Sequence, residues 1–274
     1  MGFVFVDRIT ALDAESAHGQ LDLVAGDPAL PPWLILEAVG QLAAWIAMAR
    51  TDFRSRPVAA LIGEAQLDDA AWCDRADAAV EMTARIERID ARAILYSGTA
   101  RCGPRLIANL GRCVGPLLPL AAFDDPDLVR RRLAMLRAGG SGVARGPLPR
   151  PALTAVVIGA DGARSAQLVV PESAEYFADH FPLRPVFPAS LLADALSELA
   201  AAGAAQALGI AAAHVRTIAQ RDLKVRAFAE PGQLLALRTG PATVAGGVAT
   251  VPIVCEMHGK RTASGQLAYR AVAP

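Results

Sequence analysis

The chain repeats itself once, and this repeat limits its fold more than any other feature of the sequence. A shift of 157 positions lays PALPPWLILEAVGQLAA (28–44) on PVFPASLLADALSELAA (185–201), so that prolines, leucines and two acids, Glu37 and Asp194, coincide. A repeated segment of this kind indicates a repeated structural unit. With 274 residues, the chain is long enough for two halves that each bury a core, and we expect two equivalent halves.

In each half, a proline-rich turn leads into a helix that is apolar on nearly every side. Proline is well placed near the first helical turn, because the N–H that it lacks would have no partner there. A helix that is apolar all round must be enclosed by other elements. Alternating apolar and polar residues predict strands around it at 80–89, 91–100, 106–114, 153–159, 165–170, 234–240 and 248–257. This order fits a sheet that wraps one long helix, made twice.

A connector separates the two halves. Residues 123–151 open with an Asp/Pro helix start, continue as a basic helix and end in Gly/Ser/Pro-rich chain. We therefore place the N-terminal unit at 1–121, the connector at 122–150 and the C-terminal unit at 151–274. The basic run RRRLAMLR within the connector has two interpretations, an interaction surface or a solvated linker helix, and its charge favours the solvated helix.

The composition argues against several classes of protein. Twenty-seven basic residues balance 27 acidic ones, so the positive surface expected of a nucleic-acid-binding protein is missing. The four cysteines, at 73, 102, 113 and 255, form no C-x-x-C pair and predict neither a metal site nor a redox motif.

No secretory signal pattern and no membrane span are predicted. The N-terminus lacks a basic segment leading into an apolar one. The apolar run 33–49 is interrupted by Glu37 and Gln41 and is shorter than the roughly 20 residues that a span needs. We expect a cytoplasmic protein in which this run is a buried helix.

One histidine and two acids are candidates for chemistry. His180 lies among Phe181, Pro182, Pro185 and Phe187, a rigid apolar turn that would hold its imidazole in place and suit it to act as a base.

An acid on an apolar helix is costly to bury without a partner. Each acid has a second polar residue four positions later, Gln41 after Glu37 and Glu198 after Asp194, which places each pair on one helix face. The alternative is that both acids are satisfied structural residues.

These residues carry a family resemblance. The segment HFPLRPVFPASLLADAL (180–196) resembles the signature of bacterial 3-hydroxyacyl-acyl-carrier-protein dehydratases, H-F-P-G-x-P-x-x-P-G followed by a helix with an acid fourteen residues after the histidine. The first half is similar through GDPALPPWLILEAVGQLAAW (26–45). FVFVDRITALD (3–13) and RDLKVRAFAEPGQLL (221–235) match as well, so the resemblance covers both halves. The family's turn glycines are replaced by Leu183 and Ala189.

The resemblance implies an α+β double hot-dog fold, in which a curled antiparallel sheet surrounds a central helix in each unit. Such units work as dimers whose catalytic histidine and acid come from different units, and a two-unit chain would form this dimer within itself. The position equivalent to His180 in the first half is Leu23, which cannot move a proton. The complete site would therefore join His180 to Glu37, while Leu23 and Asp194 would form a site without a base.

The resemblance also implies a reaction and its participants. The reaction is dehydration of a 3-hydroxyacyl thioester on acyl carrier protein to the trans-2-enoyl thioester, without metal or organic cofactor. His180 would remove the proton next to the carbonyl, and Glu37 would protonate the departing hydroxyl. Ala189 would stabilise the enolate-like charge through its amide, and Gln41 would orient Glu37 or a water. Phe181 and Pro188 complete the expected substrate contacts.

Two other functions remain open on the sequence. The first is a hot-dog acyl thioesterase, in which the helix acid activates water. The second is a non-catalytic protein that binds acyl carrier protein or supports a partner enzyme. A homodimer of the whole double unit is compatible with each function, and neither a nucleic acid nor a membrane is expected as a partner.

Overall fold

The computed structural model describes residues 3–22, 33–68, 79–140 and 148–272. The proline turn predicted for the first half, with Leu23, Pro28, Pro31 and Pro32, lies outside the described residues, as does Cys73. The first half contains β1 (Arg8–Leu12), β2 (Ser16–Asp22), α1 (Trp33–Arg50), β3 (Ser55–Pro57), β4 (Leu61–Leu67), β5 (Ala79–Ile89), β6 (Ala93–Cys102) and β7 (Arg105–Pro119).

The second half repeats this order after a connecting helix. Its elements are α3 (Pro126–Ala138), β8 (Thr154–Ile158), β9 (Arg164–Val169), α4 (Ala189–Leu208), β10 (Val215–Val225), β11 (Leu234–Thr239), β12 (Thr243–Ala245), β13 (Val248–Met257) and β14 (Lys260–Ala271). Short 3-10 turns lie at Leu120–Ala122, Glu175–Ala178 and Ala212–His214. All seven predicted strands are present, with shifts of a few residues at their ends.

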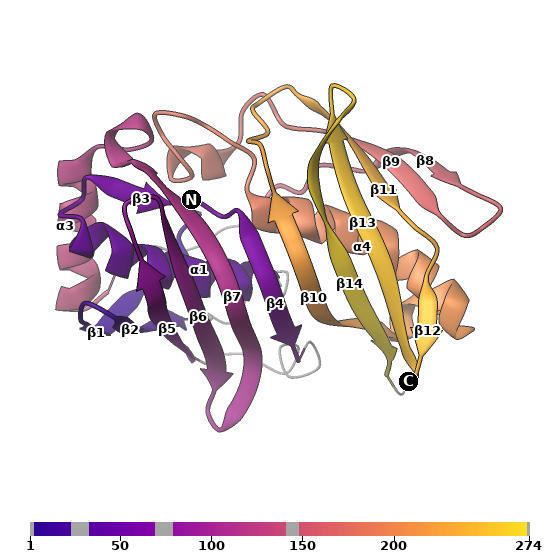
Figure 1. The fold of residues 1–274 in the computed structure, drawn as a ribbon, viewed down its shortest axis with the longest axis horizontal. Coiled ribbons are helices and arrows are strands. Elements are labelled where there is room, and N and C mark those ends of the chain that lie inside the picture. The colour runs from indigo at the N-terminus through magenta and orange to yellow at the C-terminus, as the bar shows by residue number, and fades with distance from the viewer. Residues whose placement is uncertain (1–2, 23–32, 69–78, 141–147, 273–274) are drawn as a thin grey trace.

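One antiparallel sheet runs through both halves (Figure 1). Its order is β1-β2-β5-β6-β7-β4 in the first half, continued by β10-β14-β13-β11-β9-β8 in the second, and the two halves join where β4 pairs with β10. The second order mirrors the first. Glu64 on β4 lies opposite Arg221 on β10, and these two residues are 157 positions apart, the spacing of the sequence repeat. A local twofold axis therefore passes through this pair.

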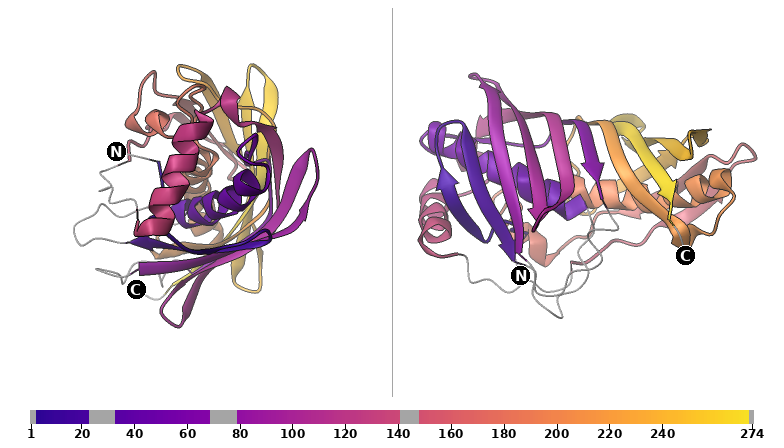
Figure 2. Two further views of the ribbon diagram at one scale, coloured as in Figure 1. Left: turned by 90° about the vertical axis from the view of Figure 1, so that its left-hand side faces the viewer. Right: turned by 90° about the horizontal axis from the view of Figure 1, so that it is seen from below.

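The sheet curls around the two long helices (Figure 2). Helices α1 and α4 each have twelve buried residues, and one hydrophobic core contains residues of both halves. By length and composition both helices could span a membrane, but 67% and 61% of their apolar windows are buried inside the protein. Burial within the sheet explains their apolar character, as expected for core helices.

Helix α4 begins and ends where its sequence requires. Pro188 precedes the first turn, and its carbonyl accepts a hydrogen bond from the amide of Leu192 at 3.0 Å. Gly209 ends the helix in a left-handed conformation, with φ 68°, that glycine adopts without steric penalty. The helix start is thus held next to the turn that carries His180.

The connecting helix differs from the prediction of a solvated linker. Asp125 caps α3 by accepting hydrogen bonds from two backbone amides, as the Asp/Pro signal indicated. However, Val129, Leu133 and Leu136 are buried, and α3 packs on the edge strand β1. The prediction of a solvated linker helix was wrong for one face of α3, because the basic residues that suggested it are interspersed with apolar residues at helical spacing.

Candidate functional site

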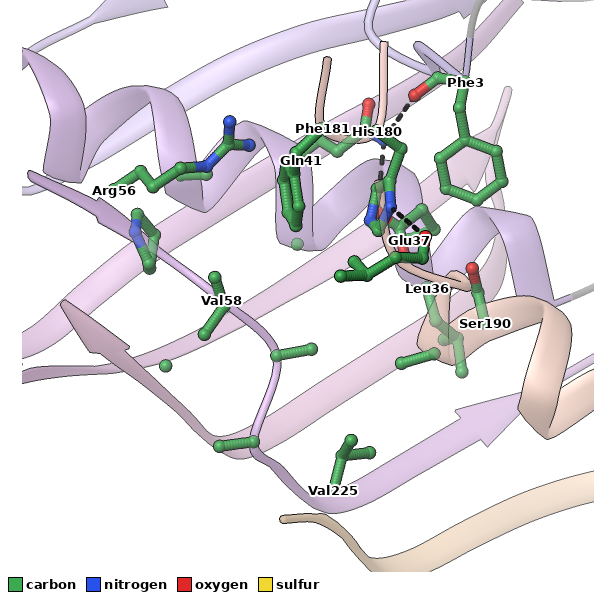
Figure 3. Close-up of a pocket in the computed structure, with 18 of the residues that line it drawn as sticks. Phe3, Leu36, Glu37, Gln41, Arg56, Val58, His180, Phe181, Ser190 and Val225 are labelled. Atoms are coloured by element: carbon green, nitrogen blue, oxygen red, sulfur yellow. Dashed lines mark hydrogen bonds between the residues drawn. The ribbon is translucent and has the colours of Figure 1, made fainter. Parts of the chain in front are cut away.

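One pocket lies where the two halves meet, and residues of both halves line it. The first half contributes Glu37 and Gln41 from α1 and Arg56 from β3. The second half contributes His180 and Phe181 from the turn before α4 (Figure 3). The structure therefore brings together the histidine and the acid that the sequence analysis paired across the repeat.

His180 is held by aromatic rings and by backbone. Its imidazole stacks on Phe181, with ring centres 4.2 Å apart, and meets the ring of Phe3 edge-on at 5.0 Å. Its Nδ1 lies 3.4 Å from the carbonyl oxygen of Val186. If Nδ1 carries the proton and donates to this oxygen, Nε2 has a free lone pair with which to accept a proton.

Burial also determines the charge state of His180. Burial, reinforced by the positive charge of Arg56, lowers the pKa of His180 to about 3. The imidazole is therefore neutral at physiological pH, because desolvation and a neighbouring cation both disfavour its protonated form.

Glu37 is positioned by Gln41, one helical turn further along α1 (Figure 3). Gln41 Nε2 donates to Glu37 Oε1 at 3.2 Å and to the carbonyl of Phe3 at 3.0 Å, while its Oε1 accepts from the amide of Phe5 at 2.9 Å. These bonds determine which way the Gln41 amide points. Gln41 is therefore hydrogen-bonded to the Glu37 carboxyl and held in place by the backbone of Phe3 and Phe5.

Burial has the opposite effect on Glu37 to its effect on His180. It raises the pKa of Glu37, and the hydrogen bond from Gln41, the nearby Ser190 and the charge of Arg56 offset only part of this rise. Burial disfavours the carboxylate and so favours a protonated Glu37. A neutral histidine and a protonated carboxylic acid are the states needed for a base and an acid acting in one step.

Arg56 is a site residue that the sequence analysis missed. Its guanidinium lies over the Phe181 ring at 3.9 Å, and its Nη1 is 4.0 Å from Asp124 Oδ2. Burial lowers the pKa of Arg56 to about 10, which still leaves it a cation at neutral pH. Arg56 sits on a three-residue strand without a motif, so no signal in the sequence could have identified it.

The start of α4 forms another wall of the pocket. Ala189 and Ser190 line it, and the first amides of a helix have no partner within the helix, so they can donate to a ligand. Pro188 is buried and is not part of the lining, so the structure does not place it in contact with a substrate. Neither Leu183 nor Ala189 has a positive φ, and the turn is formed without the family's glycines.

The second acid, Asp194, lies elsewhere. It does not line the pocket and instead forms an ion pair with Arg150 of the connector, with Nε and Oδ2 3.0 Å apart. Burial raises the pKa of Asp194 to about 6, against the opposing effect of Arg150. Glu198 is exposed to solvent. The Asp194 pair thus lacks the inward arrangement of Glu37 and Gln41, and Leu23 is outside the described residues.

No cluster for a metal ion is found in the parts of the chain that the structure describes. A group of three or more histidine, cysteine, aspartate or glutamate side chains in binding positions is absent there. Cys102, Cys113 and Cys255 are free thiols, and the last two are buried.

Comparison with known protein sequences gives one partial match. No family model matches the sequence. A 3-hydroxyacyl-[acyl-carrier-protein] dehydratase, FabZ, of Rhizorhabdus wittichii is 33% identical over 98 residues. This match covers 35% of the chain and 59% of the relative, so the chain spans less than two thirds of that protein.

Solved structures match over nearly the whole chain. The dehydratase domain of PpsC from Mycobacterium tuberculosis, in complex with C12:1-CoA, has a TM-score of 0.54 at 16% identity and covers 99% of this chain and 100% of its own. The chain has the double hot-dog fold. The prediction of an α+β double hot-dog from the sequence is thus confirmed.

The double hot-dog fold does not select one activity. A protein assigned as an oleoyl thioesterase from Lactobacillus plantarum has a TM-score of 0.62 at 11% identity, covering 94% of this chain and 97% of its own. A 12:0-ACP thioesterase from Umbellularia californica has a TM-score of 0.55 at 8% identity, covering 94% of each chain. Dehydratases and thioesterases share this architecture, so the activity has to be argued from the site.

Proposed function

We propose that the protein is a hydro-lyase that dehydrates 3-hydroxyacyl thioesters, carried on acyl carrier protein, to trans-2-enoyl thioesters, or catalyses the reverse hydration. The observation that carries this proposal is the placement of His180 and Glu37 on one pocket, from opposite halves, with pKa values displaced in opposite directions. Two such groups suit simultaneous removal and delivery of a proton.

In the proposed reaction, His180 Nε2 removes the proton from the carbon next to the thioester carbonyl. The electrons of that C–H bond form the carbon–carbon double bond, and the C–O bond to the hydroxyl breaks. Glu37 gives its proton to the departing oxygen, which leaves as water. His180 is then protonated and Glu37 ionised, and return of one proton through water restores both groups.

Two neighbours would stabilise charge during this step. The amide of Ala189, at the start of α4, would donate to the thioester oxygen as negative charge develops there. Arg56 favours the ionised form of Glu37 and so would stabilise the carboxylate formed when Glu37 loses its proton. No metal or organic cofactor takes part in this proposal.

The proposal includes a carrier, a compartment and a domain division. Acyl carrier protein would present its acyl thioester to the pocket in the cytoplasm. We propose residues 1–121 and 151–274 as the two units and 122–150 as the connector, a division supported by the mirrored strand order. A homodimer of the whole chain remains compatible with the proposal.

The test is loss of water from a defined substrate. The purified protein is incubated with 3-hydroxyacyl carrier proteins of several chain lengths, and mass spectrometry follows the mass of the carrier. We expect loss of water from at least one chain length and, in the reverse direction, gain of water by the enoyl carrier. Absence of both changes at every chain length would refute the proposal.

A thioesterase is the second candidate, because the fold is shared with the thioesterases named above. In that reaction an ionised Glu37 would activate water, but burial disfavours the ionised form. His180 would also have no role. Measuring free thiol in the same incubations separates the two: thiol release without water loss identifies hydrolysis, and neither change, with carrier binding retained, identifies a non-catalytic binding protein.

A further inference from the structure

Gln220 on β10 is a buried polar side chain with unused hydrogen-bonding capacity. It is 0% exposed, and neither its Oε1 nor its Nε2 has a hydrogen-bond partner among the residues that the structure describes. It lines the same pocket as His180 and Glu37. A buried carboxamide without partners destabilises a fold, and natural interiors contain few such groups.

Apolar residues of β4 and β10 line the pocket together with Gln220. Ile62 on β4 and Leu223 and Val225 on β10 line the pocket with it. A hydrophobic residue would fill this position without leaving polar atoms unpaired. The repeat shows that the fold does not require glutamine here, since the residue 157 positions earlier, on β4, is Gly63.

Unpaired polar atoms are concentrated in this pocket. Six buried side-chain atoms lack a partner among the described residues, and four of them belong to Gln220, Arg56 and Ser190, which all line it. Arg56 and Ser190 lie close enough to Glu37 to change its pKa, so they belong to the reactive part of the site. Gln220 has no such link to Glu37 or His180 and therefore needs a different explanation.

We propose that Gln220 recognises an additional oxygen group on the acyl chain, so that the preferred substrate is an oxygenated 3-hydroxyacyl thioester and not a plain one. A hydroxyl fits best, because it can donate to Oε1 and accept from Nε2 at once, whereas a keto group can only accept from Nε2. This inference rests on the proposed dehydratase function, since it names the substrate class of the same site.

Recognition of this kind produces strong discrimination. A pocket built to hydrogen-bond a substrate group rejects an analogue that lacks it, because the polar protein atoms then remain unpaired in the complex. An extra hydroxyl would lose its bonds to water on entering the pocket, and Gln220 would replace them. The order of preference should be hydroxyl, then keto, then unsubstituted chain.

The experiment compares acyl chains of one length. Acyl pantetheine amides, which cannot be hydrolysed as thioesters, are prepared unsubstituted or with one hydroxyl or keto group at successive carbons beyond the 3-position. Their dissociation constants are measured for the wild type, Gln220→Leu and Gln220→Met. Gln66→Met, an exposed glutamine on the neighbouring strand β4, is the matched control. The corresponding 3-hydroxyacyl carrier thioesters are then assayed for water loss.

We expect the wild type to bind one hydroxylated chain about tenfold or more tightly than the unsubstituted chain, the ratio that a single satisfied hydrogen bond produces. Gln220→Leu and Gln220→Met should abolish or reverse this preference, and Gln66→Met should retain it. Without ligand, Gln220→Leu should melt roughly 2–4 °C higher, because the unpaired carboxamide is gone.

Failure of this inference and failure of the proposed function have different signatures. If the wild type binds all chains equally, or the Gln220 variants keep the wild-type preference, the inference is wrong even where water is lost from the carrier thioesters. If the hydroxyl preference is present and depends on Gln220 but no thioester loses water, the binding inference stands and the dehydratase proposal falls.

Discussion

The two halves share one fold but differ in what their central helices do with an acid. On α1, Glu37 accepts a hydrogen bond from Gln41. It lines the same pocket as His180 of the other half. On α4, Asp194 at the equivalent position pairs with Arg150 of the connector. The difference shows that a repeat can preserve the fold while equivalent acids take different partners, because only a few side chains around each acid have to change.

The strongest test of this asymmetry is removal of the base. Under the proposed function, His180→Ala should lower the rate of water loss by about 10²–10⁴-fold, the usual contribution of a positioned proton-transfer group. Asp194→Asn should keep most of the wild-type rate. Rates are measured by mass spectrometry of the carrier. An inactive Asp194→Asn with an active His180→Ala would show that the pairing across the halves is wrong.

The next test separates chemistry from stability on α1. Glu37→Leu should abolish water loss but keep or raise the melting temperature, because a buried acid with few partners costs stability that an apolar residue does not. Glu37→Gln keeps the hydrogen bond with Gln41 possible and should be equally inactive. Thermal melts and carrier mass spectra of both variants are compared. Retention of activity by Glu37→Leu would remove Glu37 from the mechanism.

The charge of Arg56 should set the pH range of the reaction. Under the proposed function, the reaction uses a neutral His180, which exists above its pKa of about 3, and a protonated Glu37, which exists below its raised pKa. Removing the cation makes protonation of both groups easier, so Arg56→Met should move both limits of the kcat/KM profile to higher pH. An unchanged profile would contradict this role.

Arg132→Met is the matched control for that profile. Arg132 also lines the pocket, but its guanidinium bonds Asp179 at 2.8 Å, and it does not contribute to the pKa shifts of His180 or Glu37. Both substitutions remove one positive charge from the lining of the pocket. A similar shift in both variants would mean that the net charge of the pocket, and not the position of Arg56, controls the profile.

The smallest expected effect is on stability at the second acid. The folded-state pKa of Asp194 is about 6, above its ordinary value of 3.8, so the folded protein holds this proton more tightly. The stabilisation is complete below about pH 4 and is lost as the pH rises through about 6. The difference in melting temperature between the wild type and Asp194→Asn should therefore decrease as the pH rises from about 4 to about 6. If this difference did not change with pH, the pKa of Asp194 would be the same in the folded and unfolded protein, and the carboxyl would be solvated.

Much of the fold could be predicted from the sequence, but several strands could not. The helices 33–50 and 189–208 and seven strands were visible because their patterns are local. The central strands β4, β10 and β14 and the strands β1, β2, β3 and β12 were not predicted. β10 carries Arg221, Asp222 and Lys224 on one side, and a charged half-buried strand has a weak apolar signal.

The candidate site divides in the same way. His180, Glu37, Gln41 and Ala189 were named from the turn, the repeat and the family signature, and all four line the pocket. Pro188 was named from the same signature but forms the buried helix start instead. Arg56 and Gln220 were missed, because each becomes noticeable only when its burial and its unpaired atoms are known.

The sequence by itself determined that two similar units enclose two apolar helices, and that only one of them carries a histidine in the turn before its helix. Periodicity, proline placement and repetition can be read directly from the order of the residues, without knowledge of the folded structure. Only the tertiary structure decided that β4 pairs with β10, that Arg56 and Gln220 line the pocket with His180, and that Asp194 pairs with Arg150. These pairings join residues distant in sequence, and their partners and pKa values arise from burial, which exists only in the folded protein.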